Sequence, residues 1–231
     1  ERRPGFILLP EIKSAGGIIK KNPGANLYDI GDGVALIEFK TKMGTLDMDI
    51  FEMIVTGLER VETDFEGLVI GHEADTFSAG ANLFLVVMNA QSGQWEQLDL
   101  LVKRMQDILT QARYFPKPVV VAPAGMALGG GSEIIMCGSR VVAAAELYAG
   151  MVEIGAGVIP AGTGTKEHLR RILNPAMRTK GVEPLPFLQR IFEQIGLAKV
   201  ATSAEEARQL GILTPTDRVE LPTDMLEQFM A

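Results

Sequence analysis

The segment that most limits the fold of this chain is residues 118–165, the least polar part of the sequence. These 48 positions contain ten glycines and only four charged residues, Glu133, Arg140, Glu146 and Glu153. An ionised carboxylate in an apolar interior is costly unless it is paired or hydrogen-bonded. We therefore expect a buried centre in which Glu133 and Glu153 need either a partner or a chemical role.

Two interpretations of these glutamates follow from their surroundings in the sequence. Isolated carboxylates in an apolar setting are candidates for a general acid and a general base. Alternatively, one of them faces solvent and the other forms an ion pair with Arg140. Composition alone gives the two interpretations equal weight.

Apolar residues elsewhere repeat with both helix and strand periods. An amphipathic helix is predicted over residues 47–62, and one apolar stripe from Leu98 to Ala112 predicts a second helix. The uncharged, β-branched residues 118–122 predict a buried strand. The remaining predictions are a hairpin over 27–39 with its turn at 31–33, strands at 67–71 and 140–144, helices at 133–138 and 165–173, and a capped helix over 203–210. Strands that alternate with helices predict an α/β fold with helices packed around sheets.

The first 25 residues lack this periodicity. They contain several prolines and glycines, and the sequence does not begin with Met. We therefore expect residues 1–25 to be a linker or an extended arm and residues 26–231 to form the folded domain. We also expect the chain to be processed or cut from a longer protein.

Overall composition excludes several classes of protein. Apolar residues make up 47% of the 231 positions and charged residues 22%, which is typical of a globular chain. The net charge of −7 disfavours nucleic acid as a partner, and the single cysteine excludes an internal disulfide and fits a reducing compartment. No apolar run approaches the roughly 18 residues of a membrane span, and no signal peptide is visible, so we expect no membrane partner.

The triple glycine at 129–131, before the predicted helix, has two interpretations. Glycine lets a ligand approach the backbone, and the N–H groups of a helix N-terminus can hold a phosphate or an oxyanion. Alternatively, the glycines serve tight packing of a strand against a helix, and a bare triple glycine favours this second interpretation. The spacing matches neither a Walker A loop nor the dinucleotide fingerprint.

Other chemistries have weaker support. Ser132 is not part of a nucleophile elbow, and the two histidines, His72 and His168, do not stand in metal-ligand spacing with Cys137. We therefore predict no metal, and we expect Cys137 to be inert packing. Small residues in the segment 77–83 offer a second place where a backbone N–H could face a cavity, although such a segment is more often a turn.

Taken in order, three segments resemble the crotonase (enoyl-CoA hydratase/isomerase) superfamily. They are residues 77–83, 123–133 and 152–160, within a resemblance that extends over about 27–213. The resemblance implies a spiral of ββα turns with surrounding helices and a homo-oligomer of three or six subunits. It also implies an acyl-CoA thioester as substrate, whose enolate is stabilised by two backbone N–H groups.

The resemblance assigns roles to particular residues. The two N–H donors fall on Ala81 and Gly130, and the two carboxylates of the hydratases match Glu133 and Glu153. The implied substrate-binding residues are Ala79, Asn82, Leu83, Phe84 and Gly129. Because both carboxylates are present, the resemblance favours hydration of a trans-2-enoyl-CoA, with a water molecule between the two glutamates and their acid and base roles unassigned. The alternatives are a Δ3,Δ2-enoyl-CoA isomerase that uses mainly Glu153 and a module that holds acyl-CoA without turnover.

Residues 71–83, 117–131 and 158–165 resemble more specifically the hydratase-like domain at the C-terminal end of bacterial 3-hydroxyacyl-CoA dehydrogenases. This implies fatty-acid β-oxidation in the cytoplasm, a preceding dinucleotide-binding domain that holds NAD, and no cofactor within this chain. Three departures stand out. Asn82 replaces a frequent Asp and Phe84 a frequent Lys, residues 174–187 resemble an insertion, and we expect the C-terminal helical tail of the family to be missing.

Overall fold

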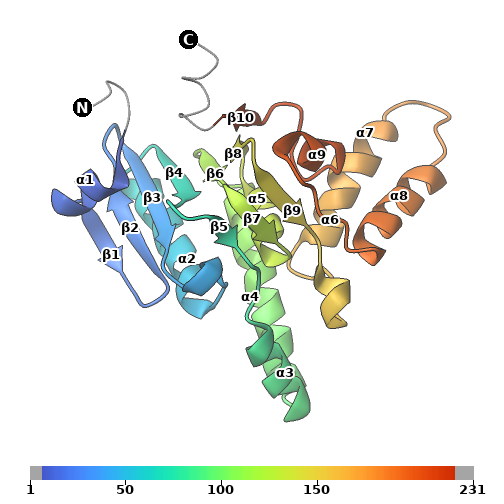
Figure 1. The fold of residues 1–231 in the computed structure, drawn as a ribbon, viewed down its shortest axis with the longest axis horizontal. Helices are drawn as coiled ribbons and strands as arrows, with labels where there is room; N and C mark the ends of the chain where they lie inside the picture. The colour runs from blue at the N-terminus through green and yellow to red at the C-terminus, as the bar shows by residue number, and fades with distance from the viewer. Residues whose placement is uncertain (1–6, 222–231) are drawn as a thin grey trace.

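The structure, a computed structural model, describes residues 7–221 and consists of two sheets with helices around them (Figure 1). The larger sheet has the strand order β1-β2-β3-β4-β6-β8-β10 and the smaller the order β5-β7-β9. The strands are β1 (Ile18–Lys21), β2 (Ala25–Asp29), β3 (Val34–Phe39), β4 (Gly67–Gly71), β5 (Thr76–Ser78), β6 (Val119–Ala122), β7 (Gly125–Leu128), β8 (Arg140–Ala144), β9 (Leu147–Gly150) and β10 (Arg218–Glu220).

Helices connect these strands and cover the sheets. The α-helices are α1 (Leu9–Ser14), α2 (Met48–Thr63), α3 (Leu83–Gln91), α4 (Trp95–Arg113), α5 (Gly130–Cys137), α6 (Gly164–His168), α7 (Asn174–Ala176), α8 (Leu185–Gly196) and α9 (Ala204–Gln209). Three short segments are the 3-10 helices η1 (Lys42–Gly44) and η2 (Glu153–Ala156) and the π-helix η3 (Leu169–Leu173). Figure 1 shows α6 to α9 gathered at one end of the molecule, opposite the β1–β3 end, with α3 projecting beyond α4.

The centre of the larger sheet is buried because its middle strands have neighbours on both sides. β4 pairs in parallel with β3 and β6, and β6 pairs in parallel with β8. The side chains of Leu68, Ile70, Val119 and Val121 are at most 1% exposed. Parallel strands covered on both faces are typically continuous apolar runs, so the predicted buried strand over 118–122 is confirmed.

Three successive pairs of strands give the fold its spiral form. β4 and β5, β6 and β7, and β8 and β9 each place one strand in the larger sheet and the next in the smaller sheet. Helices follow each pair: α3 and α4 after the first, α5 after the second, and η2 and α6 after the third. The predicted α/β fold and its spiral of ββα turns are therefore confirmed.

The predicted helices are present with small shifts at their ends. α2 begins after Asp47, whose side chain accepts the N–H of Ile50 at 3.0 Å. α9 begins after Ser203, which accepts the N–H of Glu206 at 3.1 Å, while the Glu206 carboxylate accepts the N–H of Thr202 rather than that of Ser203. The cap of α9 is thus a variant of the predicted capping box.

The prediction that residues 1–25 form a linker or an extended arm is wrong for residues 7–25, the described part of that segment. It contains α1 and β1, and β1 pairs antiparallel with β2, which itself begins at Ala25. A neighbouring strand supplies hydrogen bonds that composition cannot reveal; for example, the N–H of Asp29 donates to the carbonyl of Gly17 at 2.8 Å. The predicted loss of a C-terminal tail concerns positions outside the described residues.

The region after the third ββα turn also differs from the sequence prediction. The helix expected over 165–173 begins at Gly164 as α6 and continues as the π-helix η3. The segment 174–187 contains α7 and the start of α8. Within residues 7–221, no helix is long and apolar enough to cross a membrane.

Candidate active site

A cavity of about 530 Å³ lies between α3, α4, the start of α5 and the loop that follows β9. Its wall is largely apolar, with Val86 from α3 and Leu98 and Leu101 from α4. Among the described residues that line it, the ionisable groups are the carboxylates of Glu133 and Glu153. A concave apolar wall with a few convergent polar groups is the usual form of a small-molecule site.

The first turn of α5 is held against the smaller sheet by the hydroxyl of Ser132. This hydroxyl donates to the carbonyl of Ala127 at 2.7 Å and accepts the N–H of Gly150 at 3.0 Å. Gly129 makes the turn between β7 and α5 with a φ of 53°, a conformation that favours glycine. The start of α5, with Gly130 as its first residue, therefore has a fixed place on the cavity wall.

Two backbone N–H groups of the wall, those of Ala81 and Gly130, lack an acceptor among the hydrogen bonds of residues 7–221. They lie close together, because a Cβ atom placed on Gly130 would be 3.5 Å from the nitrogen of Ala81. Gly80, with a φ of 92°, permits this approach, since a Cβ there would stand 2.8 Å from the carbonyl of Leu128. Paired donors next to a helix N-terminus are suited to a developing oxyanion.

Glu133, the fourth residue of α5, is held by the loop that precedes α6. Its Oε1 accepts the N–H groups of Thr163 at 2.8 Å and Gly164 at 2.7 Å, and its side chain is buried. Burial raises the pKa of Glu133, and the backbone N–H groups around it oppose this rise by stabilising the carboxylate. Gly162 leaves no room for a side chain here, because a Cβ would collide with Oε2 of Glu133.

Glu153 begins η2 and reaches the turn before α5. Its Oε1 lies 3.0 Å from the place that a Cβ of Gly129 would take, and its Oε2 is buried with no hydrogen-bond partner in the described part of the chain. Burial, and after it the negative charge of Glu133, raise the pKa of Glu153 to about 7. A carboxyl group with a pKa near neutrality suits proton transfer.

The two glutamates therefore have different surroundings. Glu133 accepts two backbone N–H groups, whereas Glu153 has a free oxygen. The alternative that one of them pairs with Arg140 is wrong, because the guanidinium of Arg140 is exposed and donates to the carbonyl of Ser139.

Most of the residues that the sequence suggested line this one cavity. They are Ala79, Ala81, Leu83, Gly129, Gly130, Glu133 and Glu153. Asn82 and Phe84 are not among the lining residues: Asn82 caps α3 by accepting the N–H of Leu85 at 3.4 Å, and Phe84 is 68% exposed. Consecutive residues of a helix point to different sides. Neighbouring positions at the start of α3 therefore cannot all lie on the cavity wall, although the motif includes them all.

Sequence reasoning missed the groups that hold Glu133. The N–H donors of Thr163 and Gly164 are backbone groups, and Met105 of α4 is packed against the position where Gly162 would carry a Cβ. The available signal was the pair of glycines at 162 and 164, inside the low-charge segment. Any residue except proline can supply a backbone N–H donor. The two glycines therefore indicate close packing but do not identify Glu133 as the group packed there.

The remaining candidate groups lie away from the cavity wall. Burial raises the pKa of the Cys137 thiol to about 12, which fits an inert packing residue. Nδ1 of His168 donates to the carbonyl of Gly164 at 2.9 Å, and burial lowers the pKa of this imidazole. Within residues 7–221, no group of three or more His, Cys, Asp or Glu side chains is arranged to hold a metal ion.

The chain is similar in sequence to proteins of acyl-CoA metabolism. The sequence profile of the enoyl-CoA hydratase/isomerase family matches residues 29–179. Over 224 residues the chain is 42% identical to a probable 3-hydroxyacyl-CoA dehydrogenase of Bacillus subtilis (strain 168), covering 95% of this chain and 27% of that protein. A probable enoyl-CoA hydratase of the same organism is 34% identical over 123 residues, which cover 52% of this chain and 46% of that protein. The chain thus spans less than half the length of these relatives.

Solved structures show the same fold. The crystal structure of an enoyl-CoA hydratase from Bacillus anthracis has a TM-score of 0.68 at 24% identity, covering 90% of this chain and 73% of that one. An enoyl-CoA hydratase/isomerase from Cupriavidus metallidurans CH34 has a TM-score of 0.70 at 22% identity, covering 91% and 72%. These likenesses show the crotonase fold. Because the family profile matches more than half of the sequence, this chain belongs to the enoyl-CoA hydratase/isomerase family.

Proposed function

We propose that this chain is an enoyl-CoA hydratase, which adds water across the double bond of a trans-2-enoyl-CoA to give a 3-hydroxyacyl-CoA. The observation that carries the proposal is the pair Glu133 and Glu153, two carboxyl groups of raised pKa on one cavity wall. The apolar residues of α3 and α4 on the same wall suit a fatty acyl chain.

The N–H groups of Ala81 and Gly130 would receive the thioester oxygen. When water adds at Cβ, negative charge develops on that oxygen, and two donors near the N-terminus of α5 stabilise it. Removal of one donor in such a site typically costs about 10² to 10³ in rate. These donors belong to the backbone, so side-chain substitution does not remove them.

The different surroundings of the two glutamates support separate roles. Two N–H donors favour the ionised form of Glu133, so we assign it as the base that takes a proton from water as the oxygen bonds to Cβ. The pKa of about 7 lets Glu153 carry a proton at neutral pH, so we assign it as the acid that protonates Cα. The proton gained by Glu133 and the proton lost by Glu153 are then exchanged with solvent.

The relatives support a place for this activity within a larger protein. A product that is a 3-hydroxyacyl-CoA is the substrate of a 3-hydroxyacyl-CoA dehydrogenase, and the 42% identical relative is named as one. We propose that the chain supplies the hydratase activity of such a protein in fatty-acid β-oxidation, in the cytoplasm, as part of a homo-oligomer. NAD would then bind in the dehydrogenase part.

Turnover of a short trans-2-enoyl-CoA by the purified chain tests the proposal, followed as loss of the ultraviolet absorbance of the conjugated thioester. Because general acid–base catalysis contributes about 10² to 10⁴ in rate, we expect losses of that size in Glu133→Gln and in Glu153→Gln. The matched control is Glu146→Gln, an exposed carboxylate between β8 and β9, which we expect to leave the rate within about twofold.

Two other results would replace the proposal. If Glu133→Gln keeps full hydration, the two-carboxylate mechanism is wrong, and turnover of a 3-enoyl-CoA that depends on Glu153 alone would identify an isomerase. If the unmodified chain binds an acyl-CoA but does not convert it, the site holds the thioester without catalysis.

A further inference from the structure

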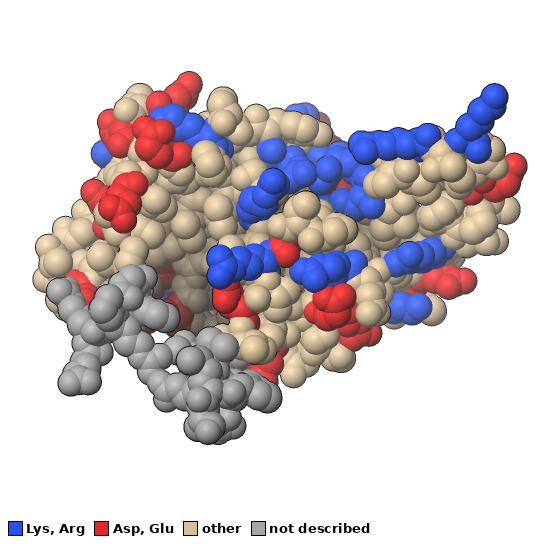
Figure 2. Space-filling model, turned by 90° about the horizontal axis from the view of Figure 1, so that it is seen from above, with Lys and Arg blue, Asp and Glu red and all other residues tan. Residues whose placement is uncertain are grey.

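A second cavity, of about 550 Å³, lies at the opposite end of α5 and shares no lining residue with the first. Seven of the twelve arginines in the sequence line it: Arg113, Arg140, Arg170, Arg171, Arg178, Arg190 and Arg208. Figure 2 shows the Lys and Arg side chains gathered in a band over the half of this face that carries α7 to α9. We refer to this second cavity as the arginine cavity.

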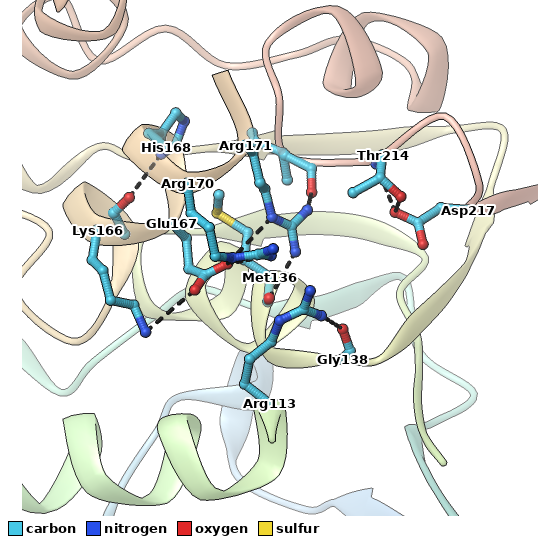
Figure 3. Close-up of polar contacts among 12 residues, drawn as sticks. Arg113, Met136, Gly138, Lys166, Glu167, His168, Arg170, Arg171, Thr214 and Asp217 are labelled. Carbon is cyan, nitrogen blue, oxygen red and sulfur yellow. Dashed lines mark hydrogen bonds and ion pairs between the residues drawn. The ribbon is translucent and has the colours of Figure 1, made fainter. Parts of the chain in front are cut away.

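Some of these arginines have a structural task (Figure 3). Arg171 donates to the carbonyl of Met136 at 2.7 Å and also contacts Glu167, and Arg113 donates to the carbonyl of Gly138. These carbonyls belong to the C-terminal end of α5, where cations are favourable. The end of α5 therefore explains two arginines. Arg208 donates to the carbonyls of Thr214 and Asp217, and Arg170 pairs with Glu167, so three arginines are left to be explained.

The exposed arginines at the edge of the cavity have no carboxylate partner among the described residues. Arg140 donates to the carbonyl of Ser139 and Arg190 to that of Gln209, so a neutral backbone group holds each guanidinium in place without neutralising it. The guanidinium of Arg178 has no hydrogen bond or ion pair with any residue of 7–221. Each of these side chains keeps N–H donors for a further acceptor.

Few carboxylates balance the seven guanidinium groups. Glu167 contacts Arg170 and Arg171, and Glu205 contacts Arg208. The carboxylate of Asp217, on the cavity wall, accepts backbone N–H groups of Val141 and Thr214. Nη2 of Arg170 is buried and forms no hydrogen bond of acceptable geometry, although it lies 2.8 Å from Glu167. The cavity thus has an excess of positive charge in a chain whose net charge is −7.

We propose that the arginine cavity binds a small anion that carries two or more phosphate groups. Arginine matches phosphate oxygens with pairs of N–H donors, and several phosphates are needed to meet several guanidinium groups. The volume is within the range of small-molecule sites, roughly 300–1,000 Å³. Side chains of Ile172, Phe187 and Leu213 on the same wall fit the organic part of a nucleotide. The shared chemistry is the oligophosphate, whether inorganic or attached to a nucleoside.

Calorimetric titration of the whole chain with inorganic triphosphate, and separately with inorganic pyrophosphate and with ADP, tests this proposal. We expect Arg178→Gln to weaken the binding of triphosphate about tenfold and Arg140→Gln/Arg178→Gln to weaken it further, since charge-assisted hydrogen bonds are the strong ones. Both side chains are exposed, so the variants are expected to fold. The matched control is Arg60→Gln, which removes one exposed arginine of α2 and should change the affinity less than twofold.

ADP and inorganic pyrophosphate carry the same number of phosphate groups, so comparing them distinguishes the sources of the phosphate. Tighter binding of ADP than of inorganic pyrophosphate supports a nucleotide and a role for the apolar wall, and equal binding supports a bare oligophosphate. The proposal is overturned if triphosphate does not bind at about 20 mM salt, where charge screening is weak. It is also overturned if Arg60→Gln weakens binding as much as Arg178→Gln does, or if an acidic peptide binds to the cavity while none of the three phosphate compounds binds.

Discussion

The two cavities have nearly equal volumes, about 530 and 550 Å³, and they lie at the two ends of the same short helix. At the N-terminus of α5 the wall is apolar and offers the free N–H of Gly130. At the C-terminus the carbonyls of Met136 and Gly138 accept hydrogen bonds from Arg171 and Arg113. The helix dipole favours negative charge at the first end and positive charge at the second. The direction of one buried helix thus favours an oxyanion at the first site and the arginine side chains at the second.

The largest effect that we expect comes from substitution of Arg171, a nearly buried residue in the wall of the arginine cavity. Its side chain is 4% exposed and that of Glu167 is 1% exposed. Arg171→Gln leaves the Glu167 carboxylate with less compensation and removes the donor to Met136, so we expect the free energy of unfolding to fall by about 3 kcal/mol. Urea denaturation followed by circular dichroism measures this change.

Arg178→Gln is the matched control for this stability measurement. It removes an arginine side chain of the same cavity that has no partner among the described residues, and we expect a change within about 0.5 kcal/mol. If both variants lose equal stability, the division between structural and free arginines is wrong. Equal losses would also weaken the case for a ligand.

The elements that the sequence predicted best were those whose own residues carry the pattern. The apolar stripe of α4 marks the one face that is buried, and the continuous apolar run of β6 marks a strand that is buried on both faces. Glu133 and Glu153 stood out because their segment contains so few charged residues. β1 and α1 were missed because their stability comes from pairing with β2 and from packing, which a local pattern does not contain.

The arginine cavity could not be predicted for a related reason. Its seven arginines come from six separate segments between residues 113 and 208, with no common spacing. Their convergence depends on the path of the chain through α7, α8 and α9. The carboxylate pair was different, because both members lie in one unusually apolar segment, where a charge is conspicuous before its partners are known.

The two cavities should differ in how they respond to pH. If Glu153 is the acid, it must be protonated, so kcat/KM should fall about tenfold per pH unit above pH 7. Arginine is protonated throughout this range, and burial lowers the pKa of Arg171 only to about 10. In Glu153→Gln the residual rate should lose this alkaline limb, and a limb that persists would assign the ionisation to another group.

The raised pKa of Glu153 also implies that the stability of the fold depends on pH. The folded state holds the proton of Glu153 more tightly than the unfolded state, so this group stabilises the fold fully below pH 4.5 and the contribution is lost as pH rises through about 7. The change is roughly 3 kcal/mol at most. Relative to Glu153→Gln, the unmodified chain should therefore lose melting temperature between pH 4.5 and 8. No difference between the two curves would place Glu153 in solvent.

The smallest effect that we expect concerns the length of the acyl chain. The first cavity should select its ligand by shape, whereas the arginine cavity should select by charge. Leu101→Ala enlarges the apolar wall, so the ratio of kcat/KM for a long trans-2-enoyl-CoA to that for a short one should rise about three- to tenfold, the effect of a few methylene groups. Phe84→Ala is the control, since it also replaces a large hydrophobic side chain with alanine. Phe84 lies on α3 outside the lining residues, so the ratio should change less than twofold. If Phe84→Ala shifts the ratio as much as Leu101→Ala does, the acyl chain follows the exposed face of α3 rather than the cavity.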